Sequence, residues 1–245
     1  MASVASQVVF HPLITSSLKV GSTTVGRDKL YRTIQYFSRF LAWYIQNYGE
    51  DKKSAVRFNN LKSALGLSRK LMRLGKPIEH LQAALKATKE VSDPVSSVCG
   101  IGRQLSYAIY LYNDMIIWAE KIKFINVDKI RLEHINKRAA QFWFTGITLN
   151  LINGLYKHQQ TQCKLKRLDN KSSIGDHEKE DRRAQIRSLS SQVHAIRLQL
   201  LQDLCDILSP SSTLGFHSLN DGVIGSAGVL SSLLGLRAQV KKVLG

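Results

Sequence analysis

The stretch KKSAVRFNNLKSALGLSRKLMRLGK, residues 52–76, holds eight Lys or Arg residues and no acidic residue. A helix turns by about 100° per residue, and at that spacing the apolar side chains of this stretch cover roughly half of a helical wheel. The spacing therefore predicts an amphipathic α-helix. Its apolar face comprises Phe58, Leu61, Ala64, Leu65, Leu67, Leu71, Met72 and Leu74, and its basic face comprises Lys62, Arg69, Lys70 and Arg73.

A helix with these two faces can lie in a membrane interface, with its leucines among the acyl chains and its cations among the lipid phosphates. Each basic residue near an anionic leaflet contributes about 1 kcal/mol to binding. The alternative is a surface helix that packs its leucines on its own core, although such helices usually mix both signs of charge. We expect a membrane-inserting face of Phe58, Leu61, Leu65, Leu71 and Met72, and a lipid-binding basic face of Lys62, Arg69, Lys70 and Arg73.

The composition points to a helical protein with an acidic partner. The 245 residues include 35 Lys or Arg against 18 Asp or Glu, which gives a formal net charge of +17. A surplus of this size favours nucleic acid or anionic lipid as a partner. Four prolines and long runs without helix breakers predict an all-α fold. Cys99, Cys163 and Cys205 are far apart and form no CxxC pair, so neither a disulfide framework nor a zinc cluster is indicated.

The small residues near the C-terminus predict a membrane helix. Gly222 to Leu236 is a run of 15 uncharged residues with four glycines. In water each glycine would weaken a helix by about 1 kcal/mol, whereas in lipid small residues allow helices to approach closely. We therefore expect a C-terminal membrane anchor that associates with other copies of the chain through Ala227, Ser231 and Gly235.

Two other segments leave alternatives open. Residues 139–156 are 18 consecutive uncharged residues, which is the lower limit for crossing a bilayer. From Arg182 to Leu208, apolar residues recur every three or four positions like a coiled-coil seam. That seam can pair with another copy of the chain or pack on the chain's own helices. Its positions are Ile186, Leu189, Val193, Ile196, Leu200, Leu204 and Ile207.

Taken in order, these segments predict a membrane-associated all-α protein with one continuous domain. The expected regions are an N-terminal helical region with the basic helix (1–95), a hydrophobic helical region that can insert in a membrane (96–156), a polar loop (157–181), a heptad-like helix (182–209) and a Gly/Ser-rich C-terminal anchor (210–245).

The sequence contains no recognisable catalytic motif. It has no HExxH metal spacing, no GxSxG and no Walker loop. Gly100-Ile101-Gly102 lacks the third glycine of a dinucleotide fingerprint and follows no predicted strand. We expect a protein that is not an enzyme and that needs neither a metal nor a cofactor.

Several motifs resemble those of one protein family. They are Arg27-Asp28-Lys29 with the run RTIQYFSRF at 32–40 and Ala42-Trp43-Tyr44, then SRK at 68–70, RLGK at 73–76 and EHL at 79–81, and finally LNDGVIG at 219–225 and GVLSSLLGL at 228–236. Together they resemble the peroxin-eleven family of fungi, and the similarity spans nearly the whole chain.

The resemblance implies an integral protein of the peroxisomal membrane that elongates the organelle before fission, with the N-terminal region and both termini in the cytosol. Its implied partners are anionic phospholipid, other copies of itself and the dynamin-related fission machinery. A second activity that the resemblance implies is a pore for small metabolites, which residues 98–119 with Arg103 and Asp114 could line. Nucleic-acid binding would explain the charge, but it would leave the leucine face and the small-residue segment without a purpose.

Overall fold

The computed structural model describes residues 9–89, 93–169 and 176–244, and this part of the chain is all-α, as predicted. The helices are α2 (Pro12–Ser22), α3 (Thr24–Tyr48), α4 (Lys52–Leu71), α5 (Lys76–Ala87), α6 (Pro94–Lys121), α7 (Lys129–Asp169), α8 (Asp176–Asp206), α9 (Leu208–Thr213) and α10 (Asp221–Leu244).

Local sequence signals explain where several helices begin. Thr23 and Asp51 cap α3 and α4, because each side chain accepts hydrogen bonds from backbone N–H groups of the first turn. Asp93 caps α6 in the same way, and Pro94 follows at the first helical position. Gly75 separates α4 from α5 with a φ of 83°, a left-handed conformation that glycine adopts without steric cost.

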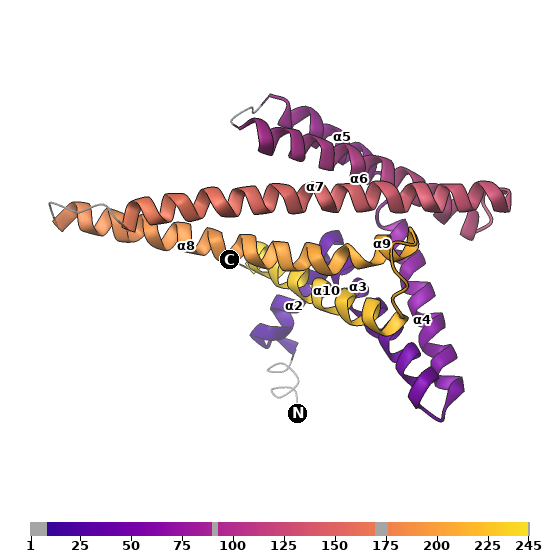
Figure 1. Cartoon of the computed structure of the whole chain (residues 1–245). Coiled ribbons are helices and arrows are strands. Elements are labelled where there is room, and N and C mark those ends of the chain that lie inside the picture. Colours follow the sequence, from indigo (N-terminus) through magenta and orange to yellow (C-terminus); the bar gives the residue numbers. More distant parts are fainter. Residues whose placement is uncertain (1–8, 90–92, 170–175, 245) are drawn as a thin grey trace.

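Six of the helices form a closed ring. In sequence order α3 packs on α4, α6 on α7 and α7 on α8, while α10 returns between α8 and α3 (Figure 1). Contacts between α4 and α6 close the ring, and α5 lies outside it against α6. The 41 residues of α7 give this helix a length of about 60 Å. Helices that are far apart in the sequence, such as α3 and α10, therefore pack side by side.

The main apolar cluster lies where α6 and α7 pack together. Tyr110, Leu111, Ile117 and Ala139 are buried there, with half-buried apolar side chains around them. The rings of Tyr110 and Trp143 are stacked with their centroids 5.4 Å apart. Stacked aromatic pairs of this kind add to the apolar contact that joins the two helices.

The predicted polar loop at 157–181 is wrong for the part that the structure describes. Residues 157–169 continue α7 and residues 176–181 begin α8, whereas residues 170–175 lie outside the described residues. The segment is rich in Lys, Gln, Leu and Arg, which are good helix formers. Its polarity therefore reflects exposure to solvent and does not indicate a loop.

The apolar seam of α8 packs within the chain. Val193 is buried, and the side chain of Leu200 lies against Gly154 of α7. Helix α8 also packs on α10. The seam thus adopts the intramolecular alternative, and pairing through it with another copy stays a prediction.

Candidate membrane-binding site

The basic face of α4 points into the helix bundle. Nε of Arg69 donates to Oδ1 of Asp28 over 2.9 Å, and its Nη1 donates to Oε1 of Gln35 over 2.8 Å. Both groups are on α3, so the pair joins α4 to its neighbour. Nζ of Lys62 lies 3.7 Å from Oδ2 of Asp221, which is at the start of α10.

The C-terminal end of α4 is joined to α6 through one carboxylate. Lys70 pairs with Asp114, and Nη2 of Arg73 donates to Oδ2 of the same residue over 2.7 Å. Nη1 of Arg73 also donates to the hydroxyl of Tyr110 over 3.2 Å. Asp114 is 6% exposed, so these pairs lie in the interior, where charges must be paired.

The structure therefore corrects the predicted orientation of the basic face. Lys62, Arg69, Lys70 and Arg73 all contact carboxylates of the same chain and do not face outward. A helical wheel gives the angle between two faces, but it does not say which face meets the protein. Binding of lipid phosphates by these four residues stays a prediction.

Burial and charge act in opposite directions on these groups. The pKa of Lys70 is lowered because burial disfavours its ammonium form, and the opposing effect of Asp114 is smaller. Burial alone would raise the pKa of Asp28, but the guanidinium of Arg69 beside it lowers the pKa below its usual range. The carboxylate of Asp28 is thus stabilised in its charged form by α4.

The predicted apolar face of α4 reaches the surface in part. Leu61 and Leu71 are 41% and 51% exposed, while Phe58, Leu65 and Met72 are half-buried. Further apolar side chains of α4, of the turn after it and of α5 are also exposed, with exposed polar residues such as Arg57 and Asn60 among them. We call this group the apolar edge, and it consists of Val56, Leu61, Leu71, Leu74 and Ile78. Insertion of this edge into lipid stays a prediction.

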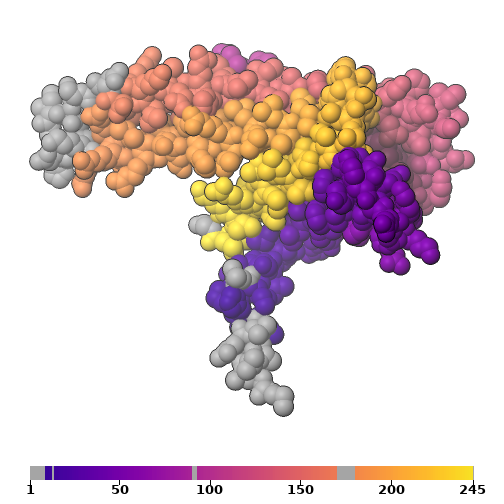
Figure 2. All heavy atoms as spheres, turned by 60° about the horizontal axis from the view of Figure 1, so that its bottom comes forward, coloured from indigo at the N-terminus to yellow at the C-terminus, as the bar shows by residue number. Residues whose placement is uncertain are grey.

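Among the residues that the structure describes, α10 is the single helix long and apolar enough to cross a membrane. Residues 139–156 lie in the middle of α7, which does not meet that criterion. Figure 2 shows α10 on the surface of the bundle between α8 and α3. Val223, Leu230 and Leu233 are exposed on its outer side.

The small residues of α10 lie on its inner side, against α3. A Cβ added at Gly225 would lie 2.8 Å from the backbone nitrogen of Phe40. A Cβ at Gly222 or Gly228 would overlap the ring of Trp43 or Tyr36. Glycine is thus required here for the close approach of two helices of one chain.

The residues predicted for self-association belong to the same inner side. Ser231 is fully buried and its hydroxyl donates to the carboxylate of Asp206 on α8. Gly235 is buried beside Lys29, and Ala227 is half-buried. The structure therefore places two of the three against their own chain, and association of copies through them stays a prediction.

The sequence interpretation missed the acidic partners of the basic helix. Asp28, Asp114 and Asp221 lie on three other helices, 41 to 159 positions from Arg69, Arg73 and Lys62, which they contact. Asp114 gave a usable signal, because it interrupts the apolar stripe of α6. An acid at such a position needs a buried cation nearby.

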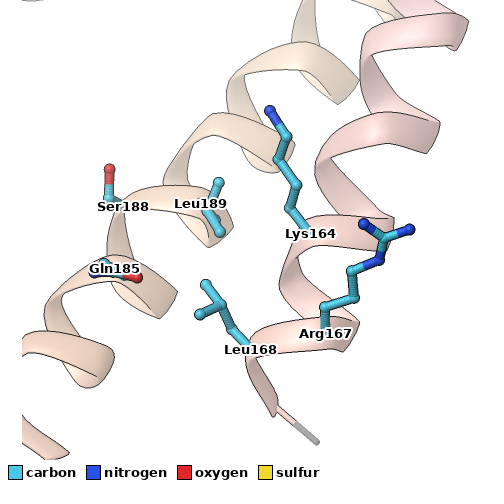
Figure 3. Close-up of a pocket in the computed structure, with 6 residues that line it drawn as sticks. All are labelled: Lys164, Arg167, Leu168, Gln185, Ser188 and Leu189. Carbon is cyan, nitrogen blue, oxygen red and sulfur yellow. The ribbon is translucent and has the colours of Figure 1, made fainter. Parts of the chain in front are cut away.

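A shallow hollow of about 430 Å³ lies far from these groups, between the C-terminal end of α7 and the N-terminal part of α8. Figure 3 shows Leu168 and Leu189 pointing into the gap, with Lys164 and Arg167 extending from α7. The hollow is mainly apolar and has no buried charge, so it offers little for specific recognition.

Comparison with known proteins identifies the family of this chain. The model of the family "Peroxisomal biogenesis factor 11 (PEX11)" matches residues 14–240. The chain is 29% identical over 238 residues to peroxisomal membrane protein PMP27 of Saccharomyces cerevisiae, covering 96% of this chain and 97% of that protein. It is 27% identical over 228 residues to human peroxisomal membrane protein 11A, covering 87% and 91%.

Peroxisomal membrane protein PMP30B of Candida boidinii is 24% identical over 247 residues, with 95% of this chain and 96% of that protein covered. No solved structure matches the chain. The family model covers the chain from α2 into α10. The chain therefore belongs to the peroxisomal biogenesis factor 11 (PEX11) family.

Proposed function

We propose that this chain remodels and elongates the peroxisomal membrane before organelle fission. The family is one of peroxisome biogenesis, and the similar proteins are named peroxisomal membrane proteins. The observation that carries the proposal is the apolar edge of α4 and α5, which lies at the surface of a helix whose other face is basic. Insertion of such a helix into the cytosolic leaflet would widen that leaflet and favour curvature.

In this mechanism the apolar edge makes the first contact with the membrane. Leu61 and Leu71 are already exposed, so they can enter the interface without a change of fold. The four cations face inward, and they reach lipid phosphates only when α4 turns or separates from α3 and α6. An anionic leaflet favours that movement, because its phosphates compete with Asp28 and Asp114 for the same cations.

Helix α10 is the proposed membrane anchor. Its 24 residues span about 36 Å, and the uncharged run at 222–236 spans about 22 Å, so the basic residues after it must extend to the lipid headgroups if the helix is to cross a core of roughly 30 Å. Its outer side already carries exposed leucines, whereas its glycines are covered by α3. We place both termini in the cytosol, and we propose other copies of the chain and dynamin-related fission proteins as partners.

Tubulation of vesicles tests the remodelling function. The full-length chain is reconstituted in vesicles that contain anionic lipid, and tubules are counted by electron microscopy. Leu61→Glu with Leu71→Glu should abolish tubulation, because two charges would lie where acyl chains must be. Ser190→Glu with Ser191→Glu is the matched control, since both serines are exposed on α8, away from the apolar edge, and the change in charge is equal. Equal tubulation by the two double variants would refute insertion of the apolar edge.

The alternative function is a pore for small metabolites. One observation favours it, because Arg103 lines a cavity where α3, α4, α6 and α8 converge. Asp114, the other residue predicted to line a pore, is instead bound to Lys70 and Arg73. Flux of a small anion from vesicles that contain the purified chain would support a pore, whereas tubulation without flux would support remodelling alone.

A further inference from the structure

A cavity of about 420 Å³ lies where α3, α4, α6 and α8 converge, and residues of α5 and α7 also line it. Seven of the side chains that line it are Lys or Arg, and three are Asp. Counting the adjacent Asp114, and Glu79, which pairs with Lys76, the site keeps a surplus of two positive charges. A buried surplus of this kind is unfavourable unless an anion balances it.

Three of the four aspartates in or beside the cavity already form ion pairs with cations that line it. Asp206 pairs with Arg32, and Asp28 pairs with Arg69. Asp114 serves both Lys70 and Arg73, so two cations share one negative charge. The third aspartate of the lining, Asp203, accepts hydrogen bonds from Asn150 and Gln199 and forms no ion pair among the described residues.

Two cations of the cavity have no carboxylate at ion-pair distance within the described part of the chain. These are Lys29 on α3 and Arg103 on α6. The guanidinium of Arg103 lies 5.3 Å from the ring centroid of Tyr107, and its Nε is buried without an acceptor. Nε of Arg73 is also buried without an acceptor. Two unsatisfied guanidinium donors in one cavity indicate that an oxygen-rich acceptor is missing.

The protonation of Lys29 agrees with this charge surplus. Burial lowers the pKa of its ammonium, and the nearby Arg32 lowers it further. Asp206 and Asp28 oppose the change, but each is already paired with an arginine. A bound anion would remove this unfavourable interaction between the two cations.

We propose that this cavity binds a phosphate-bearing anion, either the headgroup of an anionic lipid or a free phosphate ester. A phosphate monoester carries a charge of about −1.5 to −2 at neutral pH and presents three acceptor oxygens. Arginine is suited to such groups, because its planar guanidinium donates to two oxygens at once. The volume is within the roughly 300–1,000 Å³ of small-molecule sites. Anion binding in this cavity is a property separate from the proposed membrane remodelling, which does not require it.

The first experiment uses the full-length chain in a neutral detergent, with glycerol phosphate as the probe in isothermal titration calorimetry. We expect saturable binding of one molecule per chain. Arg103→Gln should weaken binding about tenfold or more, the usual effect of losing one charge-assisted hydrogen bond. Arg103→Lys should weaken it less. Arg131→Gln is the matched control, because it removes the same charge from an exposed position on α7 and should leave affinity unchanged.

Thermal unfolding separates loss of binding from loss of fold. Without the probe, Arg103→Gln should melt at the same temperature as the natural chain or higher, because it removes a buried charge without a partner. Glycerol phosphate should raise the melting temperature of the natural chain and not that of Arg103→Gln. A probe that stabilises both proteins equally would overturn the assignment to this cavity.

The second experiment identifies the source of the phosphate. Short-chain phosphatidic acid in the same detergent replaces glycerol phosphate, with short-chain phosphatidylcholine as the neutral comparison. Binding of both phosphate probes identifies a site for a free phosphate ester, and binding of phosphatidic acid alone identifies a lipid headgroup site. The proposal is overturned if neither probe binds, or if Arg131→Gln weakens binding as much as Arg103→Gln. Tubulation by Arg103→Gln should be unchanged, which keeps this test separate from the remodelling function.

Discussion

Helices α4 and α10 both have one face suited to a membrane, but different forces join them to the bundle. Helix α4 is fixed mainly by charge, through Asp28 on α3 and Asp114 on α6. Helix α10 is fixed mainly by shape, because its glycines allow α3 to approach its backbone. Contacts of the first kind can be opened by an anion that competes for the cations, although burial limits their screening by salt, whereas contacts of the second kind offer no charge to compete for. The comparison indicates that α4 is the easier of the two to release.

The largest effect should come from Asp114→Asn, which leaves Lys70 and Arg73 buried without a carboxylate. Removal of one partner from a buried ion pair costs about 3–5 kcal/mol of stability. Chemical denaturation in detergent would measure this loss, and flotation with anionic vesicles should show stronger binding because the cations of α4 are released. Asp221→Asn is the control, since Asp221 is 44% exposed and its pairs should contribute less than about 1 kcal/mol. Equal losses for the two variants would contradict the role given to Asp114.

A substitution at one of the α10 glycines that lie against α3 tests how much close packing contributes to stability. Gly228→Ala should destabilise the protein by about 1–3 kcal/mol, because its methyl group would overlap the ring of Tyr36. Gly100→Ala in α6 is the matched control, as nothing lies within 4 Å of the added carbon. It should stabilise the protein by about 0.5–1 kcal/mol through helix propensity. Thermal unfolding of the two variants measures both effects, and a stabilising Gly228→Ala would show that α10 does not pack on α3 in this way.

Acid should weaken the attachment of α4 more than that of α10. Arg69 lowers the pKa of Asp28 in the folded chain, so this pair contributes stability at pH values above the ordinary 3.8 of an aspartate. The contribution is lost as the pH falls below 3.8, through the lowered pKa of the folded state. Hydrogen exchange at pH 7 and pH 3, corrected for the intrinsic rates, should show a larger loss of protection in α4 than in α10. Asp28→Asn should remove much of this difference.

The smallest effect should come from Lys62→Gln, which breaks the contact between α4 and the start of α10. The Lys62–Asp221 distance of 3.7 Å and the exposure of Asp221 limit the loss of stability to less than about 1 kcal/mol. Affinity for anionic vesicles should nevertheless fall, because the basic face loses one of its four cations. Vesicle flotation and denaturation together check this outcome. Unchanged affinity would exclude Lys62 from the lipid-binding face.

Part of this arrangement could be predicted from the sequence. The periodicity of residues 52–74 and the turn before Lys76 give α4, and the end of α3 at Gly49 is also visible. The orientation of α4 could not be predicted, because a lipid phosphate and a distant carboxylate satisfy an arginine equally well. The glycines of α10 were similarly ambiguous. Small residues permit close helix packing both in lipid and within one chain, and only the position of Tyr36 and Phe40 distinguishes the two.

The closure of the ring has a mechanical consequence. The joint between α4 and α6 depends mainly on the carboxylate of Asp114, a clasp that binds Lys70 and Arg73, with a hydrogen bond from Arg73 to Tyr110 beside it. Opening the clasp would break no helix, because Gly75 and the turn at Gly49 to Asp51 lie at the two ends of α4 as ready pivots. Once the contact of Arg69 with Asp28 on α3 had opened as well, α4 would move as a rigid rod about 30 Å long. The local concentration of anions at a membrane would in this way set the position of α4 relative to the rest of the molecule.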